Sequence, residues 1–331
     1  MTPEEQRYHG TVNRIAFSLL VLYGAFTVYG VIMNFILPLF TDRMSAVAGH
    51  VTYELIYGVL YAAVFVLPVF FYYYISKKAS PAPFDATFTL PRETPLYIFV
   101  GLAIISAAGY LNSLLLEVFD YGTFTDEFFF ESDITLNYQV VLMMFTLAIV
   151  PGFVEELLFR GVILNNLLPF GRTTAVFASA LLFGIMHQNA GQFLYATVAG
   201  LVFGYIYVHT RSLWCCVLMH FCNNFLSLVH TVLLERLPEN SAMPLLFGME
   251  LVVFLLGIVA AVYLILYKSE DHTNVLQSGA FEVELAPDAE YAEVAIPPAR
   301  RVRLFFTAPM IVFFVLCAAQ IIVLVLLSLV N

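Results

Sequence analysis

The chain has 331 residues, of which 61% are hydrophobic and only 11% are charged, and its formal net charge is -10. Soluble domains carry roughly 25% charged residues, so the composition excludes an ordinary soluble domain. The acidic balance also argues against a nucleic-acid partner. Runs of about 20 apolar residues recur along the sequence, which predicts an all-α, polytopic bundle of membrane helices with the lipid bilayer as its first partner.

We expect about nine membrane-spanning helices joined by short polar connections. They cover residues 14–40, 51–76, 95–118, 138–163, 173–188, 191–209, 212–234, 244–267 and 304–330. The first apolar run is too long for a cleaved signal peptide, so we interpret it as a retained helix. The spans divide into an N-terminal three-helix region (1–136), a catalytic four-helix core (137–235) and a C-terminal two-helix region (236–331).

The distribution of Lys and Arg predicts the orientation of these helices. With a cytoplasmic N-terminus, eleven of the 14 basic residues fall in inside segments, Arg43 and Arg236 fall outside, and Arg160 lies within a helix. This bias follows the positive-inside rule. The short N-terminus and compact loops favour the plasma membrane of a prokaryote.

Two connections are longer and more acidic than the others. Residues 119–137 carry five acids among several aromatic residues, which predicts an acidic outer loop. Residues 268–303 carry seven acids before a proline pair and two arginines, a composition typical of a mobile linker on the cytoplasmic side. Within it, residues 281–285 alternate as in a short strand.

The most unusual stretch lies in the fourth span, where Glu155, Glu156 and Arg160 interrupt an apolar helix. A charge in hydrocarbon costs at least a few kcal/mol, so such residues are rare and mark functional sites. Glu156 and Arg160 are four residues apart with the acid first, the favoured order for an ion pair on one helix face. Glu155 points about 100° away around the helix and has no local partner. It is therefore available for chemistry.

Two later spans carry the other polar residues of the expected core. The fifth span ends in a Phe183–His187 pair, and the seventh places His220 and Asn224 four residues apart on one face. Each pair alone is typical of packing or of hydrogen bonding between helices. Because we find no second polar cluster in the apolar spans, we expect these residues to join the acidic helix in one site.

Hydrolysis of an amide by water needs a general base and hydrogen-bond donors for the oxyanion. A carboxylate in a low-dielectric cavity gains basicity, so Glu155 is the candidate base. We expect His187 to hold the same water or to protonate the leaving amine. His220 and Asn224 are the candidate oxyanion donors. We expect Glu156, Arg160 and Phe183 to hold the catalytic residues in position without contacting the substrate.

The three motifs, Glu-Glu-x-x-x-Arg, Phe-x-x-x-His and His-x-x-x-Asn, follow one another on separate helices between residues 150 and 225. In this order they resemble the CPBP family of CAAX proteases and bacteriocin-processing enzymes, which includes the Ras-converting CAAX endopeptidase. The resemblance implies an intramembrane glutamate endopeptidase without a cofactor, whose base matches Glu155 and whose other catalytic positions match His187, His220 and Asn224. It implies a membrane protein or peptide as substrate, and no residue pattern outside the motifs indicates whether that substrate is prenylated.

Three other interpretations remain open. Two glutamates and two histidines are possible zinc ligands, although the sequence has no His-Glu-x-x-His motif. Cys216 lies four residues before His220 and suggests a thiol mechanism, although the four cysteines in apolar runs are more simply packing residues without disulfides. The polar residues would also suit a transporter, a scaffold or an immunity factor.

One feature of the fifth span conflicts with a shared site. If that helix began at the membrane surface at residue 173, His187 would lie about 20 Å along it, much deeper than Glu155. We therefore predict that Asn165–Arg172 dips into the bundle and starts the span below the surface.

Overall fold

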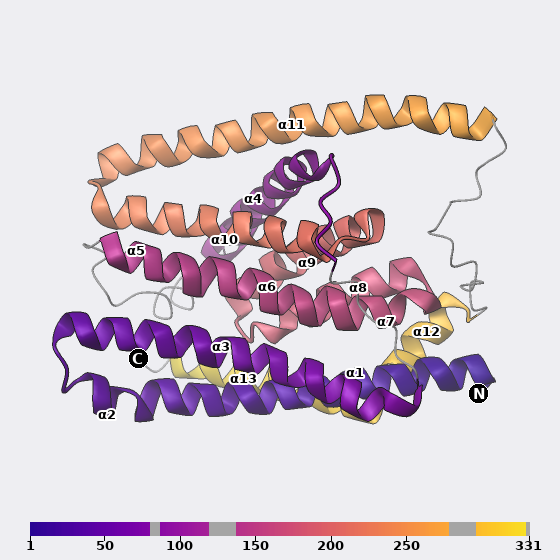
Figure 1. Ribbon diagram of the computed structural model, residues 1–331, viewed down its shortest axis with the longest axis horizontal. Coiled ribbons are helices and arrows are strands. Elements are labelled where there is room, and N and C mark those ends of the chain that lie inside the picture. Colours follow the sequence, from indigo (N-terminus) through magenta and orange to yellow (C-terminus); the bar gives the residue numbers. More distant parts are fainter. Residues whose placement is uncertain (80–86, 119–136, 278–295, 329–331) are drawn as a thin grey trace.

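The computed structural model describes residues 1–79, 87–118, 137–277 and 296–328, which form a bundle of long helices without a strand (Figure 1). The α-helices are α1 (Pro3–Val31), α2 (Pro38–Thr41), α3 (Ala46–Ser76), α4 (Thr94–Val118), α5 (Asn137–Met143), α6 (Val150–Glu156), α7 (Asn165–Leu167), α8 (Arg172–Met186), α9 (Ala190–Thr210), α10 (Leu213–Arg236), α11 (Glu239–Gln277), α12 (Pro298–Phe305) and α13 (Ala308–Ser328). Turns of π-helix occupy Ile32–Ile36, Met144–Ile149 and Leu157–Leu164, and 3₁₀ turns occupy Lys77–Ala79 and Leu168–Phe170. The predicted all-α class is confirmed.

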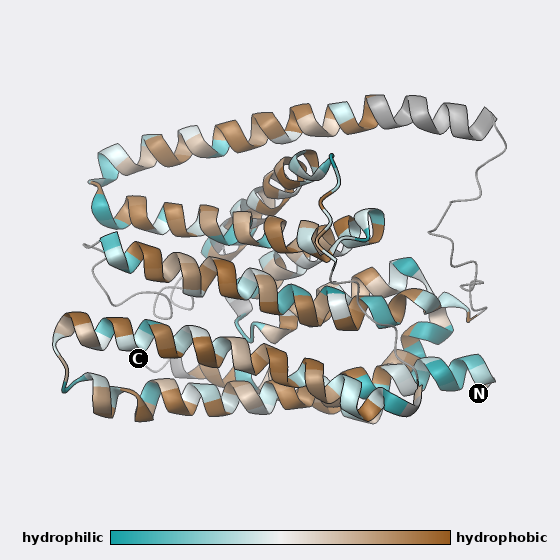
Figure 2. Cartoon of the chain, viewed as in Figure 1, coloured by the Kyte–Doolittle hydropathy of each residue, from teal (hydrophilic) through white to brown (hydrophobic). Residues whose placement is uncertain are grey.

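In the part of the chain that the structure describes, eight helical stretches are long and apolar enough to cross a membrane. The fifth expected span, α8, is not among them: it has 15 residues and is about 22 Å long, short of the roughly 30 Å of a bilayer core. It ends at His187, and the chain returns as α9. Hydrophobic residues cover the long helices, and hydrophilic residues gather at the end of the bundle where α1 begins (Figure 2). The protein is a multi-pass membrane protein.

The bounds that we expected for the linker, 268 and 303, are both wrong. Helix α11 continues to Gln277, and α12 begins at Pro298. Extending an established helix adds one hydrogen bond per residue and needs no new nucleus, so α11 can run beyond its apolar segment. The strand expected at 281–285 and nearly all of the acidic loop expected at 119–137 lie outside the described residues.

Helix α12 packs against the beginning of α1 and the end of the fourth span. Arg300 donates to Glu5 through Nε at 2.8 Å, and Arg301 donates to the carbonyl oxygen of Phe170. The ring of Phe170 packs edge-on against Tyr8 at 5.1 Å. These contacts join three segments that are far apart in the sequence.

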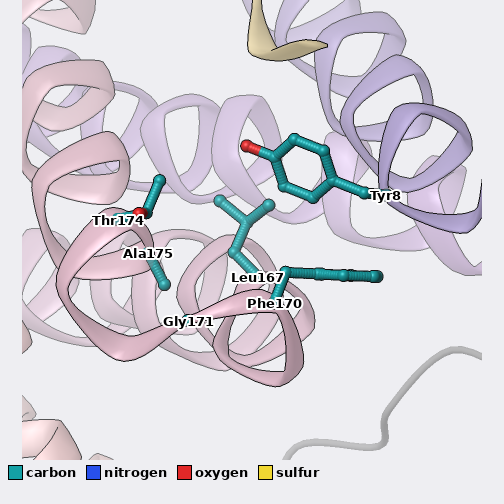
Figure 3. A pocket seen from close by; sticks show the side chains of 6 residues that line it. All are labelled: Tyr8, Leu167, Phe170, Gly171, Thr174 and Ala175. Carbon is teal, nitrogen blue, oxygen red and sulfur yellow. The ribbon is translucent and has the colours of Figure 1, made fainter. Parts of the chain in front are cut away.

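The segment Asn165–Arg172, which we expected to dip into the bundle, is buried at Asn165–Leu167 and at Phe170 and exposed at Arg172. Helices α1 and α12 cover it. A small pocket remains at this place (Figure 3), lined by Tyr8, Leu167, Phe170, Gly171, Thr174 and Ala175.

Small residues let α8 and α9 pack with their backbones close together. A Cβ atom on Gly184 would lie 2.0 Å from the hydroxyl oxygen of Thr197 and 2.9 Å from the carbonyl oxygen of Phe193. A Cβ atom on Gly200 would lie 2.9 Å from the Cα atom of Ala180. Close approach through small residues is the usual means of helix association in membranes. This packing fixes the position of His187 at the end of α8.

We predict that Gly184→Ala lowers the melting temperature of the purified protein, because the added methyl group must push α8 away from α9 at a cost of about 1–3 kcal/mol. Gly248→Ala in α11 is the matched control, since a Cβ atom there meets nothing within 4 Å. Thermal unfolding in detergent should separate the two variants. Equal melting temperatures would contradict the close packing described here.

Candidate active site

The diacidic turn lies at the end of α6, where Glu155 and Glu156 are 3% and 0% exposed. Helix α6 approaches α10 closely at Gly152, where a Cβ atom would lie 3.2 Å from the backbone nitrogen of Phe221. Because Gly152 has no side chain, the two helices approach closely, and the two carboxylates lie beside the helix that carries His220. The π-helical turn Leu157–Leu164 begins directly after them, and such turns are frequent at functional sites.

Glu156 is the centre of a buried charge network. Its Oε1 atom accepts a hydrogen bond from Arg160 at 2.9 Å and lies 2.8 Å from Nδ1 of His220. The ion pair predicted from the spacing of Glu156 and Arg160 is confirmed. The bond to His220 was not predicted, because it joins two residues on different helices, 64 positions apart in the sequence.

Arg160 is fully buried, and both of its terminal nitrogens donate hydrogen bonds, whereas Nε has no hydrogen-bond partner among the described residues. Besides Glu156, it donates to the carbonyl oxygen of Gly200 at 3.0 Å. The group lies over the rings of Phe183 and Phe203, 4.8 and 5.0 Å from their centroids. Cation–π contacts are strongest when desolvated. Arg160 therefore ties α9 and the aromatic residues behind the site to the diacidic helix.

His220 is held in one orientation by its surroundings. Its ring stacks on Phe203 at 5.0 Å with an interplanar angle of 24° and meets Phe183 edge-on at 5.8 Å. Nδ1 is directed at the carboxylate of Glu156, so the ring carries a proton on that nitrogen. The second nitrogen, Nε2, is an acceptor in the neutral ring and a donor in the imidazolium form.

His187 follows α8 and caps its end. Its Nδ1 atom donates to the carbonyl oxygen of Phe183 at 2.8 Å, and its ring packs against the ring of Phe183 at 5.0 Å. The next residue, Gln188, has a φ of 52°, a left-handed conformation that turns the chain into α9. His187 interacts electrostatically with both Glu155 and His220. The ring of Phe183 contacts the rings of both His187 and His220, so the end of α8 packs against α10.

Glu155 has one oxygen engaged and one without a partner. Its Oε1 atom accepts a hydrogen bond of 2.6 Å from the hydroxyl group of Tyr61 on α3. Its Oε2 atom is buried and has no hydrogen-bond partner among the described residues. Sequence reasoning missed Tyr61. The available signal was a polar stripe on one face of the second span, where Glu54, Tyr57 and Tyr61 follow at helical spacing.

Asn224 lies beside this cluster on α10. Its Nδ2 atom donates to the carbonyl oxygen of Leu147 at 3.0 Å, and its Oδ1 atom accepts from Asn223 at 3.1 Å. An amide nitrogen carries two hydrogens. One N–H of Asn224 therefore fixes the side chain, and the other is left for a ligand.

Neither the thiol nor the metal interpretation gains support from the side-chain positions. All four cysteines are free, and the buried Cys216 directs its sulfur to the carbonyl oxygen of Phe203 at 3.4 Å. Within the described ranges, no group of three or more His, Cys, Asp or Glu side chains is placed to hold a metal ion.

The expectation of a single polar cluster in the membrane is wrong. His230 on α10 and the buried Glu250 on α11 form a second pair, with 3.1 Å between Nε2 and Oε1. The two residues lie in different spans, and only the packing of the two helices shows that they meet.

Comparison with known proteins agrees with this geometry. A family profile described as "Type II CAAX prenyl endopeptidase Rce1-like" matches residues 137–226, which include every residue that we predicted for the site. The segment that carries the candidate site is therefore similar to the CAAX protease family. A Bacillus subtilis (strain 168) protein named "Putative membrane peptidase YdiL" is 27% identical over 150 residues, which cover 41% of this chain and 61% of that protein. No solved structure matches the chain.

We predict that Arg160→Met lowers stability strongly, because it leaves the Glu156 carboxylate without its buried cation. Removing one partner of a buried pair costs about 3–5 kcal/mol. Adding Glu156→Gln to Arg160→Met should restore part of the loss, since no uncompensated charge then remains.

Arg300→Met is the matched control, because it breaks a more exposed ion pair with Glu5. Its effect on the melting temperature should be much smaller. If Arg160→Met and Arg300→Met unfold at the same temperature, the buried network does not have the role described here.

Proposed function

We propose that this protein is an intramembrane endopeptidase that hydrolyses a peptide bond in a membrane-embedded or membrane-adjacent protein or peptide, with water activated by Glu155. The observation that carries the proposal is the buried Oε2 atom of Glu155, which has no partner among the described residues and belongs to a carboxylate that interacts with His187. An unpartnered carboxylate oxygen in an apolar bundle is a strong acceptor for the proton of a water molecule.

In the first step, the Oε2 atom of Glu155 takes a proton from water while the water oxygen attacks the carbonyl carbon of the substrate. The Nε2 atom of neutral His187 accepts a hydrogen bond from the other hydrogen of that water, because Nδ1 already donates to Phe183. The carbonyl oxygen of the substrate becomes an oxyanion.

His220 and Asn224 stabilise this oxyanion. Asn224 donates with the N–H that is not bonded to Leu147. His220 donates from Nε2 when its ring is an imidazolium, while Nδ1 stays bonded to Glu156. Donors fixed in advance around a developing charge are the largest source of rate enhancement in many enzymes.

In the second step, the carbon–nitrogen bond breaks and the proton held by Glu155 passes to the leaving amine. The products are a carboxylic acid and an amine, and no covalent intermediate forms. If His187 holds the proton instead, the same transfer occurs from its Nε2 atom. Atoms and charges balance in both cases.

The proposed reaction uses no metal ion or other cofactor. The carboxylate of Glu156 is already shared by Arg160 and His220, and a guanidinium group in contact with a carboxylate disfavours a dication at the same oxygen. The alternative is a zinc-dependent reaction. Cleavage assays with and without a strong chelator distinguish the two mechanisms.

We also propose that the protein lies in the plasma membrane of a prokaryote with its N-terminus in the cytoplasm. The distribution of Lys and Arg supports this orientation, and the similar Bacillus protein supports the source.

We predict that Glu155→Gln reduces peptide cleavage about a hundredfold to ten-thousandfold, the range for loss of a general base. The variant keeps the size of the side chain and the acceptor for Tyr61. The measurement is the rate of cleavage of prenylated and unprenylated peptides in proteoliposomes, with the products identified by mass spectrometry.

Glu54→Gln is the control, because it makes the same change in a membrane helix at a residue that accepts from Thr146 at 2.8 Å. It should cleave like the unaltered protein. Full activity of Glu155→Gln would exclude the glutamate mechanism, and absence of cleavage by the unaltered protein on every membrane peptide tested would favour a scaffold.

A further inference from the structure

The carboxylate of Glu155 is held by a helix that the family profile does not reach. Tyr61 lies on α3, 94 residues before Glu155, and its hydroxyl group donates to Oε1 at 2.6 Å. We propose that Tyr61 is a positioning residue for the hydrolytic reaction: it fixes Oε1 and thereby presents Oε2 to the attacking water. This inference rests on the proposed role of Glu155 as the base.

The hydroxyl group of Tyr61 is well placed for this role because its ring is clamped. The ring stacks on Tyr57 at 5.8 Å with an interplanar angle of 8°. It also contacts Phe65 at 5.0 Å, Phe26 at 6.2 Å and Tyr29 at 6.3 Å. Neighbours on α1 and α3 therefore restrict rotation of the ring, and the donor has little freedom to leave the carboxylate.

The packing of α3 on the catalytic helix keeps this donor at a fixed distance. A Cβ atom on Gly58 would lie 3.1 Å from the methyl carbon of Thr146, so the two helices meet closely one turn from Tyr61. On the same face, Thr146 donates to Glu54 at 2.8 Å. Contacts of both kinds fix the register of α3 against the fourth span.

The bond is also a strong one. A length of 2.6 Å lies in the range of hydroxyl–carboxylate bonds, in which the acceptor is charged. Removing the hydroxyl group therefore leaves the carboxylate free to turn away from the attacking water.

Other titratable groups also face Glu155. Tyr57 interacts with it from α3, and His187 from the end of α8. On its own helix, Glu156 is compensated by Arg160. A Tyr→Phe change at position 61 leaves all of these in place and removes one hydroxyl group.

The test compares Tyr61→Phe with Tyr72→Phe, an identical change on the same helix at a buried residue about 16 Å further along the axis. We expect Tyr61→Phe to lower kcat about tenfold to a hundredfold, as for the loss of one hydrogen bond to a charged group, with KM unchanged. Tyr72→Phe should keep the normal kcat and KM.

A purely structural role for Tyr61 would lower the melting temperature and the yield of active protein but leave kcat per active molecule unchanged, and that result would overturn the proposal. An unchanged kcat and melting temperature in Tyr61→Phe, together with an inactive Glu155→Gln, would overturn the role of Tyr61 alone. Full activity in both variants would overturn the proposed function itself.

Discussion

The carboxylate of Glu156 is the interaction on which the rest of the site depends. It lies in the apolar interior of the bundle, where an unpaired charge is very costly, and it is bonded to Arg160 and His220. Arg160 in turn binds Gly200 and two aromatic rings. The carboxylate therefore links α8, α9 and α10 to its own helix. The charge that makes the segment improbable in a membrane also orients the imidazole used in the proposed reaction.

Around this network, the two adjacent glutamates have different environments and therefore different uses. Glu156 is compensated, whereas Glu155 has a single bond from Tyr61 and one oxygen without a partner among the described residues. Glycines bring the surrounding helices close enough for this difference to be maintained, at Gly152 against α10 and at Gly184 against α9. Packing, more than local propensity, therefore separates the structural acid from the candidate base.

The parts of the site that were predictable from the sequence depend on spacing within one helix. The Glu156–Arg160 pair follows from residues four apart, and the long apolar runs predict the helices that carry the site. Contacts between helices were not predictable in the same way. Tyr61 and Glu250 each meet a partner on another helix, and nothing in one span specifies which face of another it meets. The continuation of α11 to Gln277 was missed because a polar composition was taken to indicate a loop.

The most direct measurement is an experimental structure of the protein with a bound peptidyl phosphinate, whose tetrahedral phosphorus carries two oxygens as the hydrolytic intermediate does. The proposed mechanism predicts one phosphinate oxygen about 2.6–3.2 Å from Oε2 of Glu155 and the other facing Nε2 of His220 and the amide of Asn224. A phosphinate bound with neither oxygen near Glu155 would contradict the central role of that carboxylate.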